Sequence, residues 1–371
     1  MGTQLVWFKR DLRVHDNAAL SSAAALGPVM CVYIVEPSYW RSPDASQRQF
    51  DFLRECLRDL FVQLKACGVR LQVVTGEVTD VLDRLHQAQA FSHLHAHEET
   101  GNGMTFERDK AVARWCAAHG VQWQEHTQTG VVRRLGSRTG WARRWQARMD
   151  APLHLLQGGF NAAAPMDQPT LPMLAELGLA PHGKTLQVAG EKAARRTLRS
   201  FLQERGYDYR KALSSPLSAE DGCSRLSPHL AFGTLSMRTV HQATEVAIAN
   251  TPDRAMAYGL RGFSGRLRWH CHFMQKLEDE PGIEFHNFAR VCDGLRENDW
   301  NDVHFERLRS ATTGWPLVDA CVTMLQQTGW LNFRMRAMLV SFASYHLWLH
   351  WRPTGLFLAR QFLDYEPGIH W

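Results

Sequence analysis

Short apolar runs alternate with amphipathic segments over roughly the first 130 residues, and this alternation limits most strongly what the chain can fold into. We predict five strands, at residues 5–8, 29–35, 71–74, 92–97 and 121–124. We predict helices between them at residues 47–65, 78–85 and 108–118. Alternating strands and helices indicate a parallel, doubly wound, Rossmann-like sheet with helices on both faces. Such sheets bind ligands beyond the carboxyl ends of their strands.

Strand signals almost end after residue 190, and helical spacing replaces them. The apolar residues after Trp330 recur mostly three and four apart, which indicates a helix with one buried face. They are Leu331, Met335, Met338, Leu339, Phe342 and Leu349. We expect one long helix from near Trp330 to Trp351. We therefore predict an α/β domain over residues 1–130, an interdomain linker over 131–185 and an all-α domain over 186–371. Residues 151–185 are rich in Pro, Gly and Ala, as surface linkers are.

Charge and cysteine content restrict the function classes without selecting one. The net charge of +5 over 371 residues suits a nucleic-acid partner but does not require one. The eight cysteines contain no CxxC pair, so we expect reduced thiols and no zinc site. No apolar run is long enough to cross a bilayer, and the N-terminus lacks a signal peptide's apolar core. We expect a cytoplasmic monomer with no membrane contact.

The predicted linker begins with a basic segment that has two interpretations. Trp141 and Trp145 are four residues apart and share a helical face. Six arginines surround them, which are Arg133, Arg134, Arg138, Arg143, Arg144 and Arg148. Basic residues interleaved with aromatic ones suit a phosphate backbone. The alternative, which we favour, is an interdomain strap with a solvated basic face.

Two polar groups lie near predicted strand ends. Arg10, Asp11 and Arg13 follow the first strand, and we expect them to form ion pairs that fix its loop. His93, His95 and His97 alternate along one face of the fourth strand, an arrangement that could bind a metal. We favour an interpretation without metal for these histidines.

Serine hydroxyls also mark a helix start at residues 224–227. Hydroxyls and free backbone N–H groups at such a start form an anion site. Serine-rich helix caps are also common in proteins that bind nothing, so this tetrapeptide alone is a weak signal.

Four ordered stretches resemble the photolyase and cryptochrome family. They are WFKRDLRVHDN at residues 7–17, CSRLSPHLAFG at 223–233, TGWPLVDA at 313–320 and TGWLNFRMR at 328–336. A later Trp351-Arg352 pair also matches. The resemblance implies that the all-α domain binds FAD. It also implies that the α/β domain can carry an antenna chromophore, a pterin or a deazaflavin, with residues 98–102 as a candidate contact.

The resemblance further implies roles for individual residues. The cofactor-binding residues would be Tyr209, Cys223, Ser224, Arg225, Leu226, Ser227, His270, Arg336, Asp364 and Glu366. Trp269 and Arg266 would contact the DNA lesion, and Trp300 and Trp351 would transfer electrons to the flavin. The chain departs from the family pattern at five of its positions, which are Cys223 (usually Thr), Arg266 (usually Glu), His270 (usually Arg), Phe333 (usually Asn) and His370 (usually Asn).

We therefore expect a flavoprotein in which blue light drives an electron from reduced FAD into pyrimidine dimers of DNA and splits them. The alternatives are a cryptochrome-like photoreceptor without repair activity and a truncated product without flavin. Family members continue beyond the position of Trp371, so we expect an incomplete FAD domain with weak flavin retention. The family's innermost tryptophan would then be missing, unless Trp371 substitutes for it.

Overall fold

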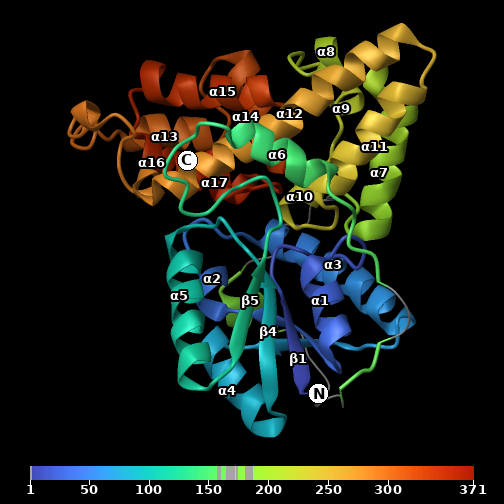
Figure 1. The fold of residues 1–371 in the computed structure, drawn as a ribbon. Helices are drawn as coiled ribbons and strands as arrows, with labels where there is room; N and C mark the ends of the chain where they lie inside the picture. Colours follow the sequence, from blue (N-terminus) through green and yellow to red (C-terminus); the bar gives the residue numbers. More distant parts are fainter. Residues whose placement is uncertain (1, 157–159, 164–171, 173, 180–186) are drawn as a thin grey trace.

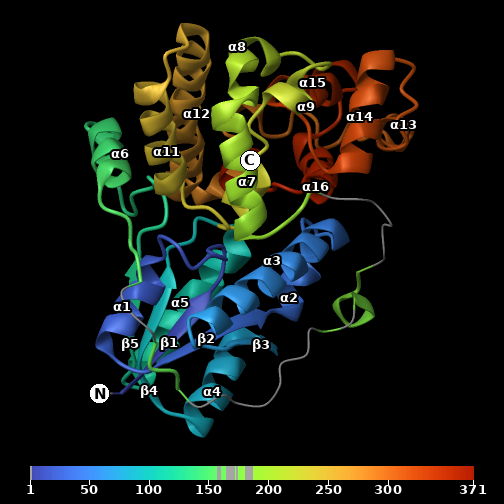
Figure 2. The ribbon, with the colours of Figure 1, turned by 90° about the vertical axis from the view of Figure 1, so that its right-hand side faces the viewer.

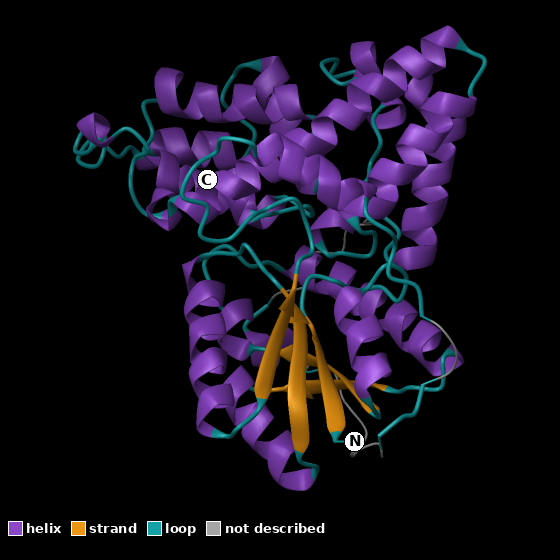
Figure 3. Ribbon diagram, viewed as in Figure 1, coloured by secondary structure: helices purple, strands orange, loops and turns teal. Residues whose placement is uncertain are grey.

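A five-stranded parallel sheet forms the core of the N-terminal part. The computed structural model describes residues 2–156, 160–163, 172, 174–179 and 187–371. The strands are β1 (Thr3–Phe8), β2 (Val29–Val35), β3 (Leu71–Thr75), β4 (Phe91–His97) and β5 (Gln122–His126). They run in the order β3-β2-β1-β4-β5, and every pairing is parallel. The predicted doubly wound sheet is confirmed (Figure 3).

Both faces of this sheet are buried under helices. Val6 and Phe8 face α1 (Ala18–Leu26) and α3 (Gln47–Ala66). Leu5 and Trp7, which alternate with them, face α4 (Val78–Ala88) and α5 (Gly103–Ala118). Consecutive strand residues point to opposite faces, and both faces are covered around β1 and β2. These two strands are therefore nearly continuous apolar runs rather than alternating ones.

Helix α1, which connects β1 to β2, was not among the predicted helices. Its sequence AALSSAAAL consists of small residues with little contrast between its faces. The helix is fixed locally, because the Asn17 side chain accepts a hydrogen bond from Leu20 N at 2.9 Å. A short helix, α2 (Pro37–Trp40), was also not predicted.

The rest of the described chain is helical, and it lies above the sheet in Figure 1. The longer helices are α6 (Trp141–Asp150), α7 (Glu191–Gln203), α11 (Met237–Asn250), α12 (Arg254–Asp279), α13 (Asp302–Arg309), α14 (Pro316–Thr328), α15 (Phe333–Ser341) and α16 (Trp351–Gln361). The shorter ones are α8 (Tyr209–Ala212), α9 (Ala219–Gly222), α10 (Ser227–Ala231) and α17 (Pro367–His370). The short 3-10 helices are η1 (Leu174–Leu177), η2 (Arg205–Asp208), η3 (Pro281–Glu284) and η4 (Arg290–Cys292).

The prediction of one long helix from Trp330 to Trp351 was wrong. Helix α15 ends at Ser341 and passes into a π-helical turn, η5 (Phe342–His346). Trp348 then adopts a left-handed backbone with φ 55°, and Trp351 begins α16 instead of ending a helix. The break carries Leu349 into the core, where it is fully buried. Burial of this side chain is a physical reason for the interruption.

Hydrogen bonds across a broad interface join the sheet half to the helical half. Arg48 of α3 donates to the carbonyls of Leu325, Gln326 and Gln361 at 2.8–2.9 Å. These carbonyls lie in the last turns of α14 and α16, where helix carbonyls begin to lack partners within the helix. The Leu325 carbonyl also accepts from Gly329 N at 2.8 Å. Gly233 lies against the backbone of Arg10, so closely that a Cβ at this position would stand 1.9 Å from the Arg10 carbonyl oxygen.

Helix α6 buries one face against the helical half and leaves the arginines of its other face exposed. It packs beside α11 (Figure 2), and Trp141 and Trp145 are 6% and 2% exposed. Residues 157–159, 164–171, 173 and 180–186 of the predicted surface linker lie outside the described residues. The domain boundaries therefore stay a prediction. None of the described helices has both the length and the apolar character that a bilayer crossing requires.

Candidate functional site

A cavity of about 560 Å³ opens between α15, α16, α17 and the segment that follows α12. This volume is in the range of small-molecule and cofactor sites. Its functionally relevant lining residues are His286, Asn287, Phe288, Phe333, Arg336, Tyr345, Trp351, Asp364, Glu366, Ile369, His370 and Trp371. Four predicted site residues therefore meet there, namely Arg336, Trp351, Asp364 and Glu366. Residues 286–288 carried no sequence signal, because only the turn after α12 brings them to this cavity.

Arg336 and Asp364 form an ion pair at the cavity wall, in which the carboxylate is buried and the guanidinium is partly exposed. Arg336 Nη2 donates to Asp364 Oδ2 at 2.7 Å, and the guanidinium lies 4.1 Å over the Phe362 ring. Asp364 is 6% exposed, and its Oδ1 is buried without a partner among the described residues. A buried carboxylate oxygen without a partner is costly, so it is suited to accept a hydrogen bond from a ligand.

A second ion pair joins α12 to the same wall. His270 Nε2 lies 2.8 Å from Glu366 Oε2. Burial alone would lower the pKa of His270, but the facing Glu366 carboxylate outweighs it and raises that pKa to about 10. His270 is therefore a cation at neutral pH, as the arginine usual at this position in the family would be.

Two indoles in contact form another part of the wall. The ring centroids of Trp351 and Trp371 lie 5.7 Å apart at an interplanar angle of 75°. Both Nε1 atoms are buried without a partner among the described residues. The Trp371 ring passes over Gly355, where a Cβ would stand 2.6 Å from it. An indole pair at a cavity can pass an electron to a redox cofactor held there, and the same pair also serves as packing.

Trp300 does not lie beside the Trp351–Trp371 pair. Its Nε1 donates to Asp302 at 2.8 Å, and its ring lies 4.9 Å from that of Phe305. It does not line the cavity, and no ring contact joins it to Trp351 within the described chain. The electron-transfer role of Trp300 stays a prediction.

The predicted residues between Tyr209 and Ser227 also lie outside the cavity lining. Tyr209, Cys223 and Leu226 are buried in the core of the helical half, and burial raises the pKa of the Cys223 thiol to about 11. Arg205 donates to the carbonyls of Ser224 and Cys223. These contacts give this part of the segment a packing role in the structure as it stands.

Arg225 lies outside the cavity lining but interacts electrostatically with Asp364. It has a left-handed backbone with φ 59°, and its guanidinium lies 4.1 Å over the buried ring of Trp330. Burial lowers the pKa of Arg225, whereas the carboxylates of Glu220 and Asp364 act to raise it. Ser227 begins α10, which has five residues and no side-chain cap. The cofactor-binding roles of these residues stay predictions.

Trp269 and Arg266 lie on the outer face of α12. Trp269 is 51% exposed, and the Arg266 guanidinium stands 5.6 Å from its ring. His270, the next residue, instead reaches Glu366 at the cavity. The structure therefore places the predicted lesion contacts close to the cavity in sequence but outside its lining.

Two departures from the family pattern do reach the cavity. Phe333 lines it and is 53% exposed. His370 Nε2 bonds to the Gly355 carbonyl at 2.8 Å, and burial lowers the pKa of His370 to about 4. His370 is therefore neutral at pH 7.

The loop after β1 is fixed by one predicted ion pair and by hydrogen bonds. Arg10 pairs with Glu99 at 3.8 Å, and Asp11 accepts a hydrogen bond from the His97 ring at 2.7 Å. Burial lowers the pKa of His97 against the pull of Asp11, so that ring is neutral. Arg13 does not fit the prediction, because it donates to the carbonyls of Asp16 and Gly233 instead.

The β4 histidines bond to their neighbours. His95 Nδ1 lies 3.3 Å from His126 of β5, and its Nε2 lies 3.0 Å from Gln4 Oε1. The described residues contain no group of three or more His, Cys, Asp or Glu side chains in a metal-binding arrangement.

The basic segment divides into paired and exposed arginines. Arg133 pairs with Glu125 at 2.7 Å, and Arg138 pairs with Asp279 at 2.9 Å. Arg148 donates to the Val131 carbonyl. Arg143 and Arg144 are exposed on α6. The segment therefore offers fewer cations to a phosphate backbone than its sequence implied.

Comparisons with known proteins agree with this architecture. Residues 4–140 match the family model for DNA photolyase, and residues 263–371 match the FAD binding domain of DNA photolyase. A deoxyribodipyrimidine photo-lyase of Vibrio cholerae is 28% identical over 97% of this chain and 80% of its own length. Cryptochrome-2 of Gallus gallus is 27% identical over 98% of this chain and 66% of its own length.

Solved structures share the fold. An archaeal photolyase from Sulfolobus tokodaii, described with two FAD molecules, superposes with a TM-score of 0.80 at 24% identity, over 99% of this chain and 81% of its own. A cryptochrome of Synechocystis gives a TM-score of 0.81 at 22% identity, over 98% and 79%. The fold and these matches define a class of two-part proteins, in which a parallel α/β sheet is followed by a helical FAD-binding domain. The chain belongs to the photolyase and cryptochrome family, and FAD is the cofactor of its helical domain.

Proposed function

We propose that this chain is a photolyase-like flavoprotein that uses blue light to split pyrimidine dimers in DNA. The observation that carries the proposal is the cavity in the matched FAD-binding domain. One wall of this cavity combines the Arg336–Asp364 and His270–Glu366 pairs with the indoles of Trp351 and Trp371. Ion pairs and electron-rich rings at a single cofactor-sized cavity suit a light-driven redox cofactor better than a purely structural role.

The residues present fit FAD on their own chemistry. The buried Oδ1 of Asp364 can accept an N–H or hydroxyl hydrogen of the cofactor, and Arg336 holds the other oxygen in place. His270 and Glu366 balance each other's charge, so the cavity wall presents fixed dipoles and no excess charge. When bound, FAD supplies light absorption and one-electron donation. Trp351 and Trp371 would supply electrons from the protein side.

The outer face of α12 supports a DNA partner. Trp269 is 51% exposed beside Arg266, and Arg261 and Arg268 are exposed on the same helix. Exposed aromatic rings among cations suit base stacking and phosphate contact. A pyrimidine dimer would have to leave the DNA double helix in order to stack on Trp269.

The decisive experiment is repair of an oligonucleotide that contains one thymine dimer. We expect the FAD-loaded protein to remove the dimer under blue light and not in the dark. The Asp364→Asn variant should lose repair together with its flavin, whereas Arg334→Gln, an exposed change on the same helix α15, should keep both.

The second candidate function is a cryptochrome-like photoreceptor. Arg266 favours it, because repair enzymes of the family usually have a glutamate at that position, and cryptochromes are among the relatives at 27% identity. If the flavin is photoreduced normally but the dimer stays intact, the repair proposal fails and the photoreceptor remains.

A further inference from the structure

The carboxyl edge of the sheet is where a second ligand would be expected. Strands β1, β2 and β4 end there, and the chain order reverses between β1 and β4. In sheets of this kind, ligands bind at such a switch point. The family resemblance also implies an antenna chromophore in this half, with residues 98–102 as a contact.

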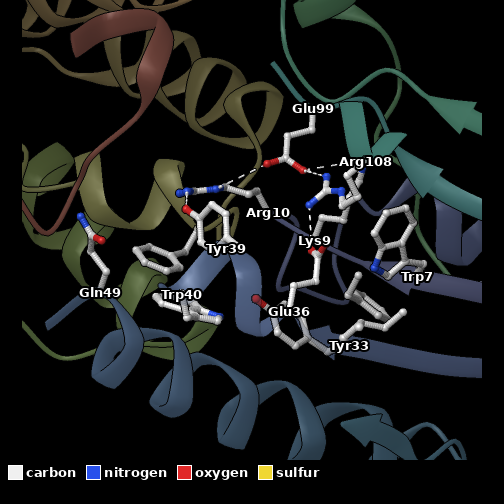
Figure 4. A pocket seen from close by; sticks show the side chains of 13 residues that line it. Trp7, Lys9, Arg10, Tyr33, Glu36, Tyr39, Trp40, Gln49, Glu99 and Arg108 are labelled. Atoms are coloured by element: carbon white, nitrogen blue, oxygen red, sulfur yellow. Dashed lines mark hydrogen bonds and ion pairs between the residues drawn. The ribbon is translucent and has the colours of Figure 1, made fainter. Parts of the chain in front are cut away.

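Charged side chains occupy this edge and satisfy one another (Figure 4). Arg108 bonds to Glu36 at 3.0 Å, to Glu99 at 2.6 Å and to Asp109 at 2.9 Å. Lys9 lies 2.9 Å from Asp109. Burial raises the pKa of Glu36 to about 7 although Arg108 opposes it, as expected for a carboxyl in dry surroundings. A polar ligand at this edge would have to break pairs that already exist.

Aromatic rings fill the space beside these charges. Tyr39 and Trp40 meet edge to face at 5.2 Å, and the Trp7 ring lies under Lys9 at 4.8 Å and under Arg108 at 5.0 Å. The cavity that remains is about 40 Å³. A cavity needs about 10–15 Å³ of such space to hold one water, so this space suits a few water molecules. A pterin or deazaflavin needs a site of roughly 300 Å³ or more.

The neighbouring cavity at the same edge is equally small. It lies between residues 97–101, the 128–131 turn and Pro367 of the helical half, and it measures about 50 Å³. Its lining residue Glu99 is held by Arg108 at 2.6 Å. Neither cavity admits a bicyclic ring.

Arg10 also ties this edge to the cofactor wall. Its guanidinium donates to the Tyr39 hydroxyl at 2.7 Å and to the carbonyls of Ala231 at 3.3 Å and Tyr365 at 3.5 Å. Tyr365 lies between Asp364 and Glu366 in the chain. A chromophore that displaced Arg10 would therefore remove one contact to the segment that carries both cavity acids.

We infer that the chain's own side chains close the carboxyl edge of its sheet, so that no pterin, deazaflavin or flavin chromophore binds there. The edge serves instead as an internal joint between the two halves. This inference rests on the family fold and does not depend on whether the protein repairs DNA.

The test titrates the FAD-loaded full chain with three fluorescent probes, which are 5,10-methenyltetrahydrofolate, 8-hydroxy-5-deazariboflavin and FMN. We expect no saturable binding up to 100-fold molar excess of each probe. The location control uses Tyr39→Ala and the conservative Glu36→Gln, with folding checked by circular dichroism.

Saturable binding whose affinity changes at least tenfold in either edge variant would overturn the inference, because the probe would then occupy the edge. Saturable binding that both variants leave unchanged places the probe elsewhere and agrees with a closed edge. Repair activity is not a readout in this test, so failure of the proposed function would not alter its result.

Discussion

Arg336 Nη2 lies 2.7 Å from Asp364 Oδ2, although the two residues are 28 positions apart. The pair joins α15 to the segment after α16 at the wall of the cavity. The Asp364 side chain is 2% exposed, whereas that of Arg336 is 24% exposed. The arginine therefore balances a buried charge whose second oxygen stays available to a ligand.

The first prediction separates the role of Arg336, which balances the charge, from that of Asp364, which accepts a hydrogen bond from the ligand. Asp364→Asn keeps the shape but removes the charge and one acceptor, so we expect FAD affinity to fall at least tenfold. Arg336→Met leaves a buried carboxylate unpaired, and we expect a loss of about 2–4 kcal/mol in the free energy of unfolding. Flavin content after gel filtration and urea unfolding measure the two effects. Arg334→Gln is the control, and equal flavin in the parent and Asp364→Asn would refute the assignment.

The second prediction concerns pH and the His270–Glu366 pair. Because the folded pKa of His270 is raised from 6.5 to about 10, the folded state keeps a proton that the unfolded chain loses. The stability from this pair is fully present below pH 6.5 and is lost as pH rises through 10. We expect the free energy of unfolding of the parent to fall by about 2–3 kcal/mol over that range. This is a conservative fraction of what the full pKa shift would give.

Urea unfolding between pH 6 and pH 10 tests this pair. His270→Gln and Glu366→Gln should each remove most of the extra pH dependence, and the double variant should add little to either. If the free energy of unfolding of His270→Gln depends on pH as steeply as that of the parent, another group causes the pH dependence.

Local patterns were sufficient for the sheet but not for every contact. The predicted strand at residues 29–35 coincides with β2, because a strand buried on both faces is a continuous apolar run between turn residues. The pairing of His270 with Glu366 spans 96 residues, and no periodicity indicates it. The left-handed Trp348 and the π-helical turn before it were missed, because the apolar spacing continues through the break. Their conformation depends on burial of Leu349 in the completed fold.

The third prediction concerns the joint between the halves. Arg48 is 6% exposed and donates to three carbonyls of the helical half. Arg48→Met would leave the Gln326 and Gln361 carbonyls without this donor, so we expect about 2–4 kcal/mol of destabilisation. Arg58→Met, an exposed change on the same helix, should cost less than about 0.5 kcal/mol. Equal unfolding midpoints for the two variants would contradict this role for Arg48.

The fourth prediction concerns DNA. Arg266 on α12 and Arg143 on α6 are exposed, whereas Arg133 and Arg138 are already paired within the protein. We expect Arg266→Gln to weaken binding to dimer-containing DNA and to reduce the slope of log K against log salt by about 1. Arg133→Gln should change the slope less. Fluorescence anisotropy from 50 to 200 mM salt measures both, and a flat response in the parent would remove DNA as a partner.

The last prediction concerns electron supply to the cofactor. Trp351 lines the cavity in contact with Trp371, whereas Trp348 lies outside the lining and donates its Nε1 hydrogen to Asp299 at 3.1 Å. Trp330 is 5% exposed in the core beneath Arg225. We expect Trp351→Phe to slow light-driven reduction of the bound flavin at least tenfold, because an indole donor is lost while most packing remains. In the Trp348→Phe variant the bound flavin should be reduced at the parent's rate.

Trp330→Phe supplies the contrast, because it should lower the free energy of unfolding by about 1–2 kcal/mol and leave the reduction rate unchanged in the folded fraction. Absorbance of the flavin under constant blue light with an external reductant measures the rate for each variant. If Trp351→Phe is reduced as fast as the parent, the electrons do not pass through Trp351. The Trp371→Phe variant then decides whether the second indole of the pair acts alone, since it lines the same cavity wall.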